Sequence, residues 1–153
     1  MGIIHLMTSK NELETALKDA MRAGDDLRKR TLRMALSAIR LAEVEKGAAL
    51  DENGVLSVLQ KEVKARQESI ADAQRANRPD LVAEAEAEME VLQSFLPQQL
   101  TQNELEEMVR LVIAEVGANG PQDTGKVMKA LMPRLQGRAS GDQASQAVRR
   151  LLA

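Results

Sequence analysis

The chain has 153 residues, of which 44% are hydrophobic and 29% charged, and its formal net charge is -2. This length is enough for one or two small domains, each with a hydrophobic core. Phe95 is the only aromatic residue and there is no cysteine, so the composition favours packed helices over sheets and excludes disulfides, thiolate zinc sites and cysteine nucleophiles.

The first eight residues, MGIIHLMT, are expected to be disordered, and we expect translation to start at Met7. They lack the charged leader and the long apolar stretch of a signal peptide. His5 is the single histidine, and in this segment a surface residue is expected rather than a base or a metal ligand. No apolar run is long enough to span a bilayer, so the sequence predicts a cytoplasmic protein without membrane contact.

Four amphipathic helices are predicted in the N-terminal two thirds of the chain, because apolar residues recur there at helical spacing. The first two are expected within 9–24 and 25–47, and a glycine closes each. Ser9 with Glu12 forms a capping box before the first, and Asp25 with Asp26 favours the N-terminus of the second. The third is expected from Asp51 to a break before Pro79, and the fourth ends at Pro97. Most of the eight methionines fall on apolar stripes, where we expect them to fill the core.

The stretch LPQQLTQNE is the predicted domain boundary, because Pro97 breaks one helix and Thr101 with Glu104 forms a capping box for the next. We therefore expect two helical domains, residues 1–97 and 98–153. Three more apolar stripes follow the boundary and predict three further helices. No stretch alternates with period two, so the predicted fold class is all-α.

The segment GPQDTGKV, Gly120 to Val127, matches most of a phosphate-binding loop. Val127 stands where such a loop needs Ser or Thr for Mg²⁺, and the residues before the loop are predicted as helix instead of strand. Pro121 removes one backbone donor, and Asp123 places a carboxylate where phosphate would lie. The sequence therefore predicts no nucleotide site, and Asp123 or Thr124 is expected to cap a helix.

The longer stretch DTGKVMKALMPRLQGRASG, residues 123–141, resembles the tail domain of the GatB/YqeY family. The segments ALKDAMRAGD, LRMALSAIR, QKEVKARQESI and NRPDLVAEAEAEMEVLQSFLPQQL extend the resemblance to the stand-alone YqeY proteins over nearly the whole chain. One departure is Ser140, where the family usually carries Asp before the glycine. Asp142 is a candidate to cap the helix instead.

The resemblance implies an N-terminal helical domain followed by a small C-terminal three-helix bundle. It also implies kinship with one part of the glutamine-dependent amidotransferase that converts Glu-tRNA to Gln-tRNA, whose tail domain helps to recognise tRNA. We therefore expect a non-catalytic accessory protein that associates with tRNA or a tRNA-handling complex. Two alternatives are a component of an amidotransferase with carbon–nitrogen ligase activity and glutamine as amide donor, and a helical protein-interaction adaptor.

No catalytic constellation is found among the residues, and no cofactor or metal is expected. The serines are isolated on helices or caps, unlike the Gly- and Ser-rich nucleophile loop of a related amidase. The glutamates at 84, 86, 88 and 90 could suggest a metal site, yet no Glu-x-x-His pattern accompanies them. A solvated acidic helix face is the favoured interpretation.

The basic residues near the C-terminus are the better functional candidates. Residues 117–153 carry a net charge of +4, whereas residues 51–116 carry -8. The candidate RNA-binding residues are Lys126, Lys129, Arg134, Arg138, Arg149 and Arg150. Because no aromatic residue lies among them, contact with the phosphate backbone is expected instead of base stacking. The alternative is an ordinary solvated face with cations near helix ends.

A second basic group lies near the start of the second predicted helix and consists of Arg28, Lys29, Arg30 and Arg33. Cations at this end oppose the helix dipole, which suggests another use for them. We expect this group to pair with the acidic middle of the chain.

Overall fold

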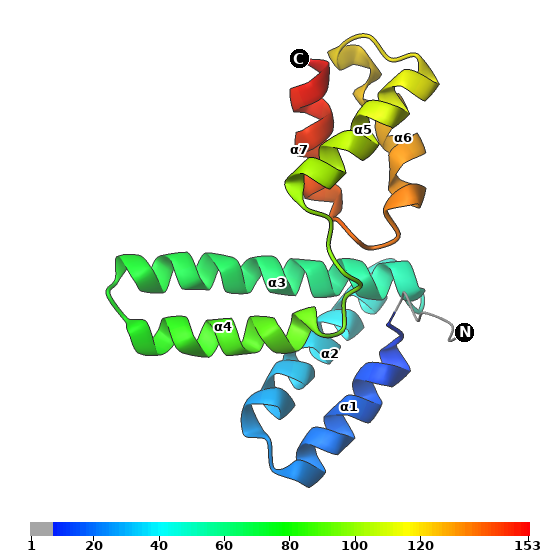
Figure 1. Ribbon diagram of the computed structural model, residues 1–153. Helices are drawn as coiled ribbons and strands as arrows, with labels where there is room; N and C mark the ends of the chain where they lie inside the picture. The colour runs from blue at the N-terminus through cyan, green and yellow to red at the C-terminus, as the bar shows by residue number, and fades with distance from the viewer. Residues whose placement is uncertain (1–7) are drawn as a thin grey trace, which may run out of the picture. The chain divides into compact units, whose positions relative to one another are not determined.

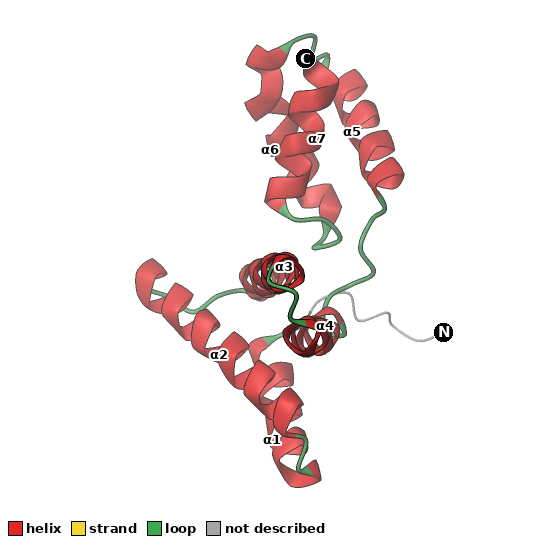
Figure 2. Cartoon of the chain, turned by 90° about the vertical axis from the view of Figure 1, so that its left-hand side faces the viewer, coloured by secondary structure: helices red, strands yellow, loops and turns green. Residues whose placement is uncertain are grey.

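The computed structural model describes residues 8–153, and these form seven α-helices and one short 3₁₀ helix without any strand (Figures 1 and 2). The predicted all-α fold class is thereby confirmed. The α-helices are α1 (Lys10–Ala23), α2 (Asp26–Lys46), α3 (Glu52–Arg75), α4 (Pro79–Gln93), α5 (Gln102–Val116), α6 (Thr124–Leu135) and α7 (Gly141–Leu152). The 3₁₀ helix η1 (Pro121–Asp123) directly precedes α6.

Thr8 tests the prediction that the first eight residues are disordered. The expected disorder of residues 1–8, the expected translation start at Met7 and the position of His5 lie outside the described residues, except at Thr8. Thr8 is only 6% exposed, and its hydroxyl donates a hydrogen bond to the carbonyl oxygen of Phe95. For Thr8 the prediction of disorder is therefore wrong, because this contact ties the residue to the fold.

The chain divides into two compact units, Met1–Pro97 and Gln98–Ala153. In the N-terminal unit, α3 and α4 lie side by side as a long hairpin, and α1 packs along α2 (Figure 1). The hydrophobic core of this unit draws residues from all four helices. Its buried members are Leu13, Ala20, Leu32, Ala35, Leu36, Ile39, Val55, Leu59, Val63 and Leu92.

The helix ends follow the chemistry of a few residues. The side chains of Ser9, Asp25 and Asp51 accept hydrogen bonds from first-turn amides of α1, α2 and α3. Gly24 and Gly47 end α1 and α2 with φ of 70° and 76°, a left-handed conformation that glycine adopts without a Cβ penalty.

The end of α4 differs from the prediction. We expected this helix to stop at Pro97, but it ends at Gln93 and Ser94 is its C-cap. The amides of Phe95 and Leu96 donate to carbonyl oxygens three residues earlier, so the chain tightens into turns before the proline. Proline also disfavours helical geometry for the residue that precedes it, which is consistent with an early end.

The C-terminal unit is built from α5, η1, α6 and α7 around its own small core. Capping boxes start two of its helices, Thr101 with Glu104 before α5 and Ser140 with Gln143 before α7. Ser140 is therefore the cap of α7, and the alternative that Asp142 caps this helix is wrong. The buried core residues are Leu105, Val109, Val112, Val127, Leu131, Leu135, Ala139, Ala144, Ala147, Val148 and Leu152.

The methionines fill the cores only in part: Met89, Met108 and Met128 pack against the two cores without being fully buried. Met21, Met34 and Met132 are 50%, 47% and 41% exposed, and the other described methionines are only half-buried. Branched and smaller side chains occupy the buried centre of each stripe instead.

Candidate nucleic-acid interface

The side of α6 that faces away from the core carries two lysines. Val127, Leu131 and Leu135 are buried, which fixes the inward side of this helix. At 3.6 residues per turn, Lys126 and Lys129 then lie on the outward side, and both are exposed. Within residues 8–153 neither lysine is held in a hydrogen bond or an ion pair, so both ammonium groups are open to an external anion.

Asp123 is the acidic residue closest in sequence to Lys126, and its carboxylate is engaged elsewhere. Its Oδ2 accepts a hydrogen bond of 3.1 Å from the amide of Asn119. The Thr124 hydroxyl donates to the carbonyl oxygen of Pro121 at 2.7 Å. Asp123 is the N-cap residue of α6, as one of the two expected alternatives has it. Neither side chain makes a capping hydrogen bond, because both bonds are made within the preceding loop.

Arg134 also lies on α6, but it is bound to a carboxylate of α5. Its Nη2 forms a hydrogen-bonded ion pair with Oε2 of Glu115. This bond raises the pKa of Arg134 and lowers the pKa of Glu115. Both side chains remain about half exposed, at 45% and 50%. Arg134 can thus reach an external phosphate only by leaving or sharing its partner.

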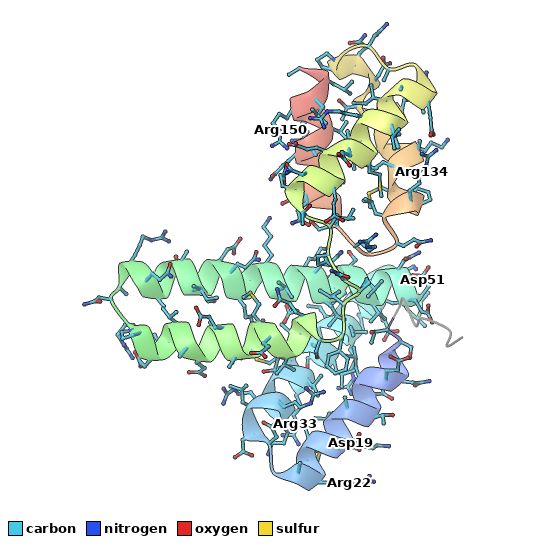
Figure 3. The ribbon with its side chains drawn as sticks, viewed as in Figure 1. Asp19, Arg22, Arg33, Asp51, Arg134 and Arg150 are labelled. Carbon is cyan, nitrogen blue, oxygen red and sulfur yellow. The ribbon has the colours of Figure 1, made fainter. Side chains whose placement is uncertain are left out.

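Arg150 of α7 is bound in a similar way on α5. Its Nη2 donates to Oε1 of Glu106 at 2.7 Å, and Arg110 lies 3.8 Å from the other carboxylate oxygen. A hydrogen bond from the Gln102 side chain and the charge of Arg150 lower the pKa of Glu106. Figure 3 labels Arg134 and Arg150 on opposite sides of α5. The glutamates of α5 therefore neutralise one arginine from each neighbouring helix.

Arg138 fastens the first residues of the C-terminal unit to the turn before α7. Its Nε donates to the carbonyl oxygen of Gln98 at 3.0 Å, and its own carbonyl oxygen accepts from the Leu100 amide at 2.8 Å. The Gln99 side chain adds a third bond of 3.0 Å to the carbonyl oxygen of Gly137. The guanidinium of Arg138 is thus engaged in structure, and we call these three bonds the linker clamp.

Arg149 completes the set of predicted residues. It is exposed, and its Nη2 donates to the hydroxyl of Ser145 one turn earlier at 2.6 Å. The six predicted residues therefore differ in their surroundings. Lys126 and Lys129 share one open side of α6, Arg149 is bound to a neutral group, and the other three arginines are bound to acceptors of their own unit.

The basic group of the N-terminal unit pairs with the acidic middle at one position. Arg30 lies 2.9 Å from a carboxylate oxygen of Glu84 and 3.4 Å from one of Glu88, which confirms the expected pairing for this residue. Lys29 instead pairs with Asp26 of its own helix at 3.4 Å. Glu84 and Glu88 consequently belong to an inter-helix network and not to a freely solvated face, a correction that follows from the packing of α4 against α2.

Sequence reasoning missed Arg66, which is the centre of that network. This residue is 6% exposed and lies on α3. Its guanidinium holds Glu88 and Glu62, each at 3.1 Å. The row of acidic residues on α4 was the signal that could have identified it. If such a row packs against another helix, its partly buried carboxylates need a cation on that helix.

Comparison with known proteins places the chain in a family. Residues 10–152 match the family described as Yqey-like protein. The chain belongs to this family. The match confirms the resemblance to the stand-alone YqeY proteins, and it spans both units of the fold.

Curated relatives of this Yqey-like chain include fungal proteins named "Altered inheritance of mitochondria protein 41, mitochondrial". The protein from Lachancea thermotolerans is 34% identical over 75% of this chain and 63% of its own length. Those from Vanderwaltozyma polyspora and Pyrenophora tritici-repentis are 38% and 29% identical, over 55% and 83% of this chain and 46% and 71% of their own lengths. The chain thus spans less than two thirds of the first two relatives.

In the part of the chain that the structure describes, no three His, Cys, Asp or Glu side chains gather to hold a metal ion. No described helix is long and apolar enough to cross a membrane. The open lysine pair of α6 is the candidate site that the side-chain geometry favours, because both lysines are exposed opposite the buried residues of that helix.

Proposed function

We propose that this Yqey-like protein is a non-catalytic accessory protein that binds tRNA or another folded RNA through its C-terminal unit. The observation that carries the proposal is the open lysine pair of α6, Lys126 and Lys129. The resemblance of residues 123–141 to a tRNA-contacting tail domain supports the same unit. Phe95 is the only aromatic residue of the chain and lies in the other unit, so contact runs through the phosphate backbone instead of base stacking.

The ion pairs of α5 refine the set of contacts. Lys126, Lys129 and Arg149 are available without breaking a bond to a carboxylate. Arg134 and Arg150 join only if an RNA phosphate competes with Glu115 and Glu106. With two or three contacts, the logarithm of the affinity falls with the logarithm of the salt concentration by about 0.7–0.9 per contact. Binding is weakly dependent on sequence, because phosphates carry no base identity.

The test is a titration of the full chain with total tRNA at several salt concentrations. The variant Lys126→Glu with Lys129→Glu reverses both charges at exposed positions, so it keeps the fold and loses measurable binding. The control variant is Lys61→Glu with Lys64→Glu on α3, which has the same charge change, the same spacing and similar exposure in the other unit. The control retains affinity within about twofold, since screened long-range charge has a small effect.

Two outcomes would overturn the proposal. One is equal loss of affinity in both double variants, because net charge and not the α6 face would then control binding. The other is no binding by the unmodified chain at low salt. In that case, proteins captured with the unmodified chain, but not with the α6 variant, decide between a helical adaptor and an amidotransferase subunit.

The compartment of this chain is part of the proposal. The sequence favours the cytoplasm, whereas the names of the fungal relatives place those proteins in mitochondria. We propose that the chain acts in whichever of these compartments holds its RNA. Fractionation of a cell that carries the tagged chain, followed by sequencing of the crosslinked RNA, identifies both together.

A further inference from the structure

An apolar stripe runs along the side of α2 that faces away from the core. Met34, Ser37, Leu41 and Val44 recur at steps of three and four, opposite the buried residues of the same helix. Met34 lies at the border of this side, because its sulfur also accepts a hydrogen bond of 3.6 Å from the Arg66 guanidinium of α3. The three apolar members are 47%, 60% and 78% exposed. We call these four residues the α2 stripe. Alternating steps of three and four are the spacing of a coiled-coil seam, and exposed apolar groups at that spacing mark an interaction surface.

The helix that carries the stripe is preformed. Asp25 caps its first turn by accepting from the Arg28 amide at 3.1 Å. At the other end Gly47 donates to the carbonyl oxygen of Glu43 at 2.8 Å. Glu43 itself binds Lys10 at 2.8 Å and the Leu50 amide at 3.0 Å on the inner side of the helix. A partner that binds the stripe therefore has little ordering entropy to overcome.

The charges beside the stripe indicate which partner fits. If Met34 and Leu41 occupy heptad position a, then Ser37 and Val44 occupy d, Arg40 occupies g and Glu45 occupies e. Arg40 and Glu45 are exposed, and in the described part of the chain neither lies within ion-pair distance of an opposite charge, although the charge of Arg40 helps to lower the pKa of Glu43 on the same helix. These two residues are five apart and lie on opposite borders of the stripe.

This spacing discriminates between the two orientations of a self-paired helix. In a parallel pair, each g residue faces the e residue five positions later on the other helix, so two symmetric Arg40–Glu45 bridges form. In an antiparallel pair, g residues meet g residues of the other helix, so Arg33 and Arg40 would face the arginines of the other copy. The chain is thus complementary to a second copy of itself in the parallel orientation only.

We propose that the α2 stripe is a homodimer interface, in which α2 pairs in parallel with α2 of a second copy around a two-fold axis. The interface is isologous, so each copy contributes the same apolar residues and both charges. The seam has only four positions, which is small compared with stable obligate interfaces. The dimer is therefore a weak one that depends on concentration.

The first test is sedimentation of the full chain over a range of concentrations. The average mass rises from that of one chain toward that of two, and the variant Leu41→Glu with Val44→Glu stays at one because it buries charge in the seam. Leu111→Glu is the matched control, since Leu111 is 62% exposed on α5 of the other unit. Its curve follows that of the unmodified chain. A mass of one chain at all concentrations up to about 1 mM, where even a dimer with a Kd of about 1 mM is substantially populated, overturns the proposal. An equal effect of the control variant also overturns it.

The second test addresses orientation and uses the absence of cysteine from the sequence. Val44→Cys crosslinks to itself under oxidation, because equivalent residues meet across a parallel seam, and Leu111→Cys does not. Arg40→Glu weakens the dimer roughly tenfold or more by placing like charges opposite one another. The exchange Arg40→Glu with Glu45→Arg restores it. A dimer without the Val44 crosslink, or without this rescue, overturns the parallel pairing.

Discussion

The two units of the chain use their charged side chains differently. In the N-terminal unit, acids and bases join helices to one another, with Arg66 bound to Glu88 at 3.1 Å and Lys10 bound to Glu43 at 2.8 Å. In the C-terminal unit, arginines also bind glutamates, but the described residues form no ion pair with the lysines of α6, and the carboxylate of nearby Asp123 accepts from the Asn119 amide instead. Charge therefore mainly holds the fold in the first unit, and part of it stays available to a partner in the second.

The difference follows from where each charge lies on its helix. Arg66 is 6% exposed between α3 and α4, so its desolvated guanidinium must have carboxylates around it. Lys126 and Lys129 face away from every buried residue of α6, where water solvates the ammonium group at no cost. Substitution of a charge should thus change stability in one unit and binding in the other.

The largest expected effect comes from the two cores. Leu131→Ala in the C-terminal unit and Leu59→Ala in the N-terminal unit each remove a fully buried side chain, at about 2–5 kcal/mol. The C-terminal unit is smaller and has less stability to lose, so Leu131→Ala should create a separate early unfolding transition. Urea denaturation followed by far-UV circular dichroism checks this. One shared transition in both variants would show that the units unfold together.

A smaller effect is expected from the ion pairs of the N-terminal unit. Arg66→Ala leaves Glu88 and Glu62 without their shared partner and should lower the free energy of unfolding by about 3 kcal/mol, the low end for a buried pair. Arg30→Ala breaks a pair whose arginine is 48% exposed and should cost about 0.2–1 kcal/mol. Urea denaturation of each variant beside the unmodified chain measures both losses in the free energy of unfolding. Equal losses in the two variants would contradict a structural centre at Arg66.

The smallest effect concerns pH. Hydrogen bonds lower the pKa of Glu115 through Arg134, and that of Glu43 through Lys10 and the Leu50 amide, below the ordinary value of 4.5. Each group therefore stabilises the folded state fully above its unfolded pKa, and this contribution is lost as the pH falls through the lowered folded pKa. Glu115→Gln and Glu43→Gln should each flatten the decrease in melting temperature below about pH 4.5.

The same glutamine variants also test the comparison between the units. Glu115→Gln leaves Arg134 without its carboxylate, so affinity for tRNA should rise at neutral pH. Glu43→Gln lies in the N-terminal unit and should leave that affinity unchanged. A filter-binding assay measures the tRNA affinity of each variant beside its melting curve. A rise in affinity in both variants would show that net charge, and not the release of Arg134, controls binding.

Local chemistry could be predicted from the sequence. The caps at Ser9 and Thr101 depend on bonds that span three residues, and the glycine ends depend on one backbone conformation. The early end of α4 was not predictable in this way, because tightened turns at Phe95 and Leu96 replace the last helical residues. Helix existence was thus easier to predict than helix length.

Partners between helices were harder to predict. The sequence grouped Glu106 and Glu115 with an acidic middle and Arg134 with a basic end, yet packing of α5 against its neighbours brings these charges together. Arg138 looked available because glycine flanks it, whereas its guanidinium binds the Gln98 carbonyl oxygen. Only Lys126 and Lys129 keep the exposure expected of them without a competing contact.

The linker clamp has a consequence for how the two units can be separated. Gln98, Gln99 and Leu100 precede the capping box, yet they are already bonded to the turn at Gly137 and Arg138. A fragment cut at Thr101 would strip three hydrogen bonds from that turn and loosen the start of α7. A fragment that begins at Gln98 retains these bonds. The C-terminal unit, expressed alone or fused to another protein, should therefore begin at Gln98, directly after Pro97.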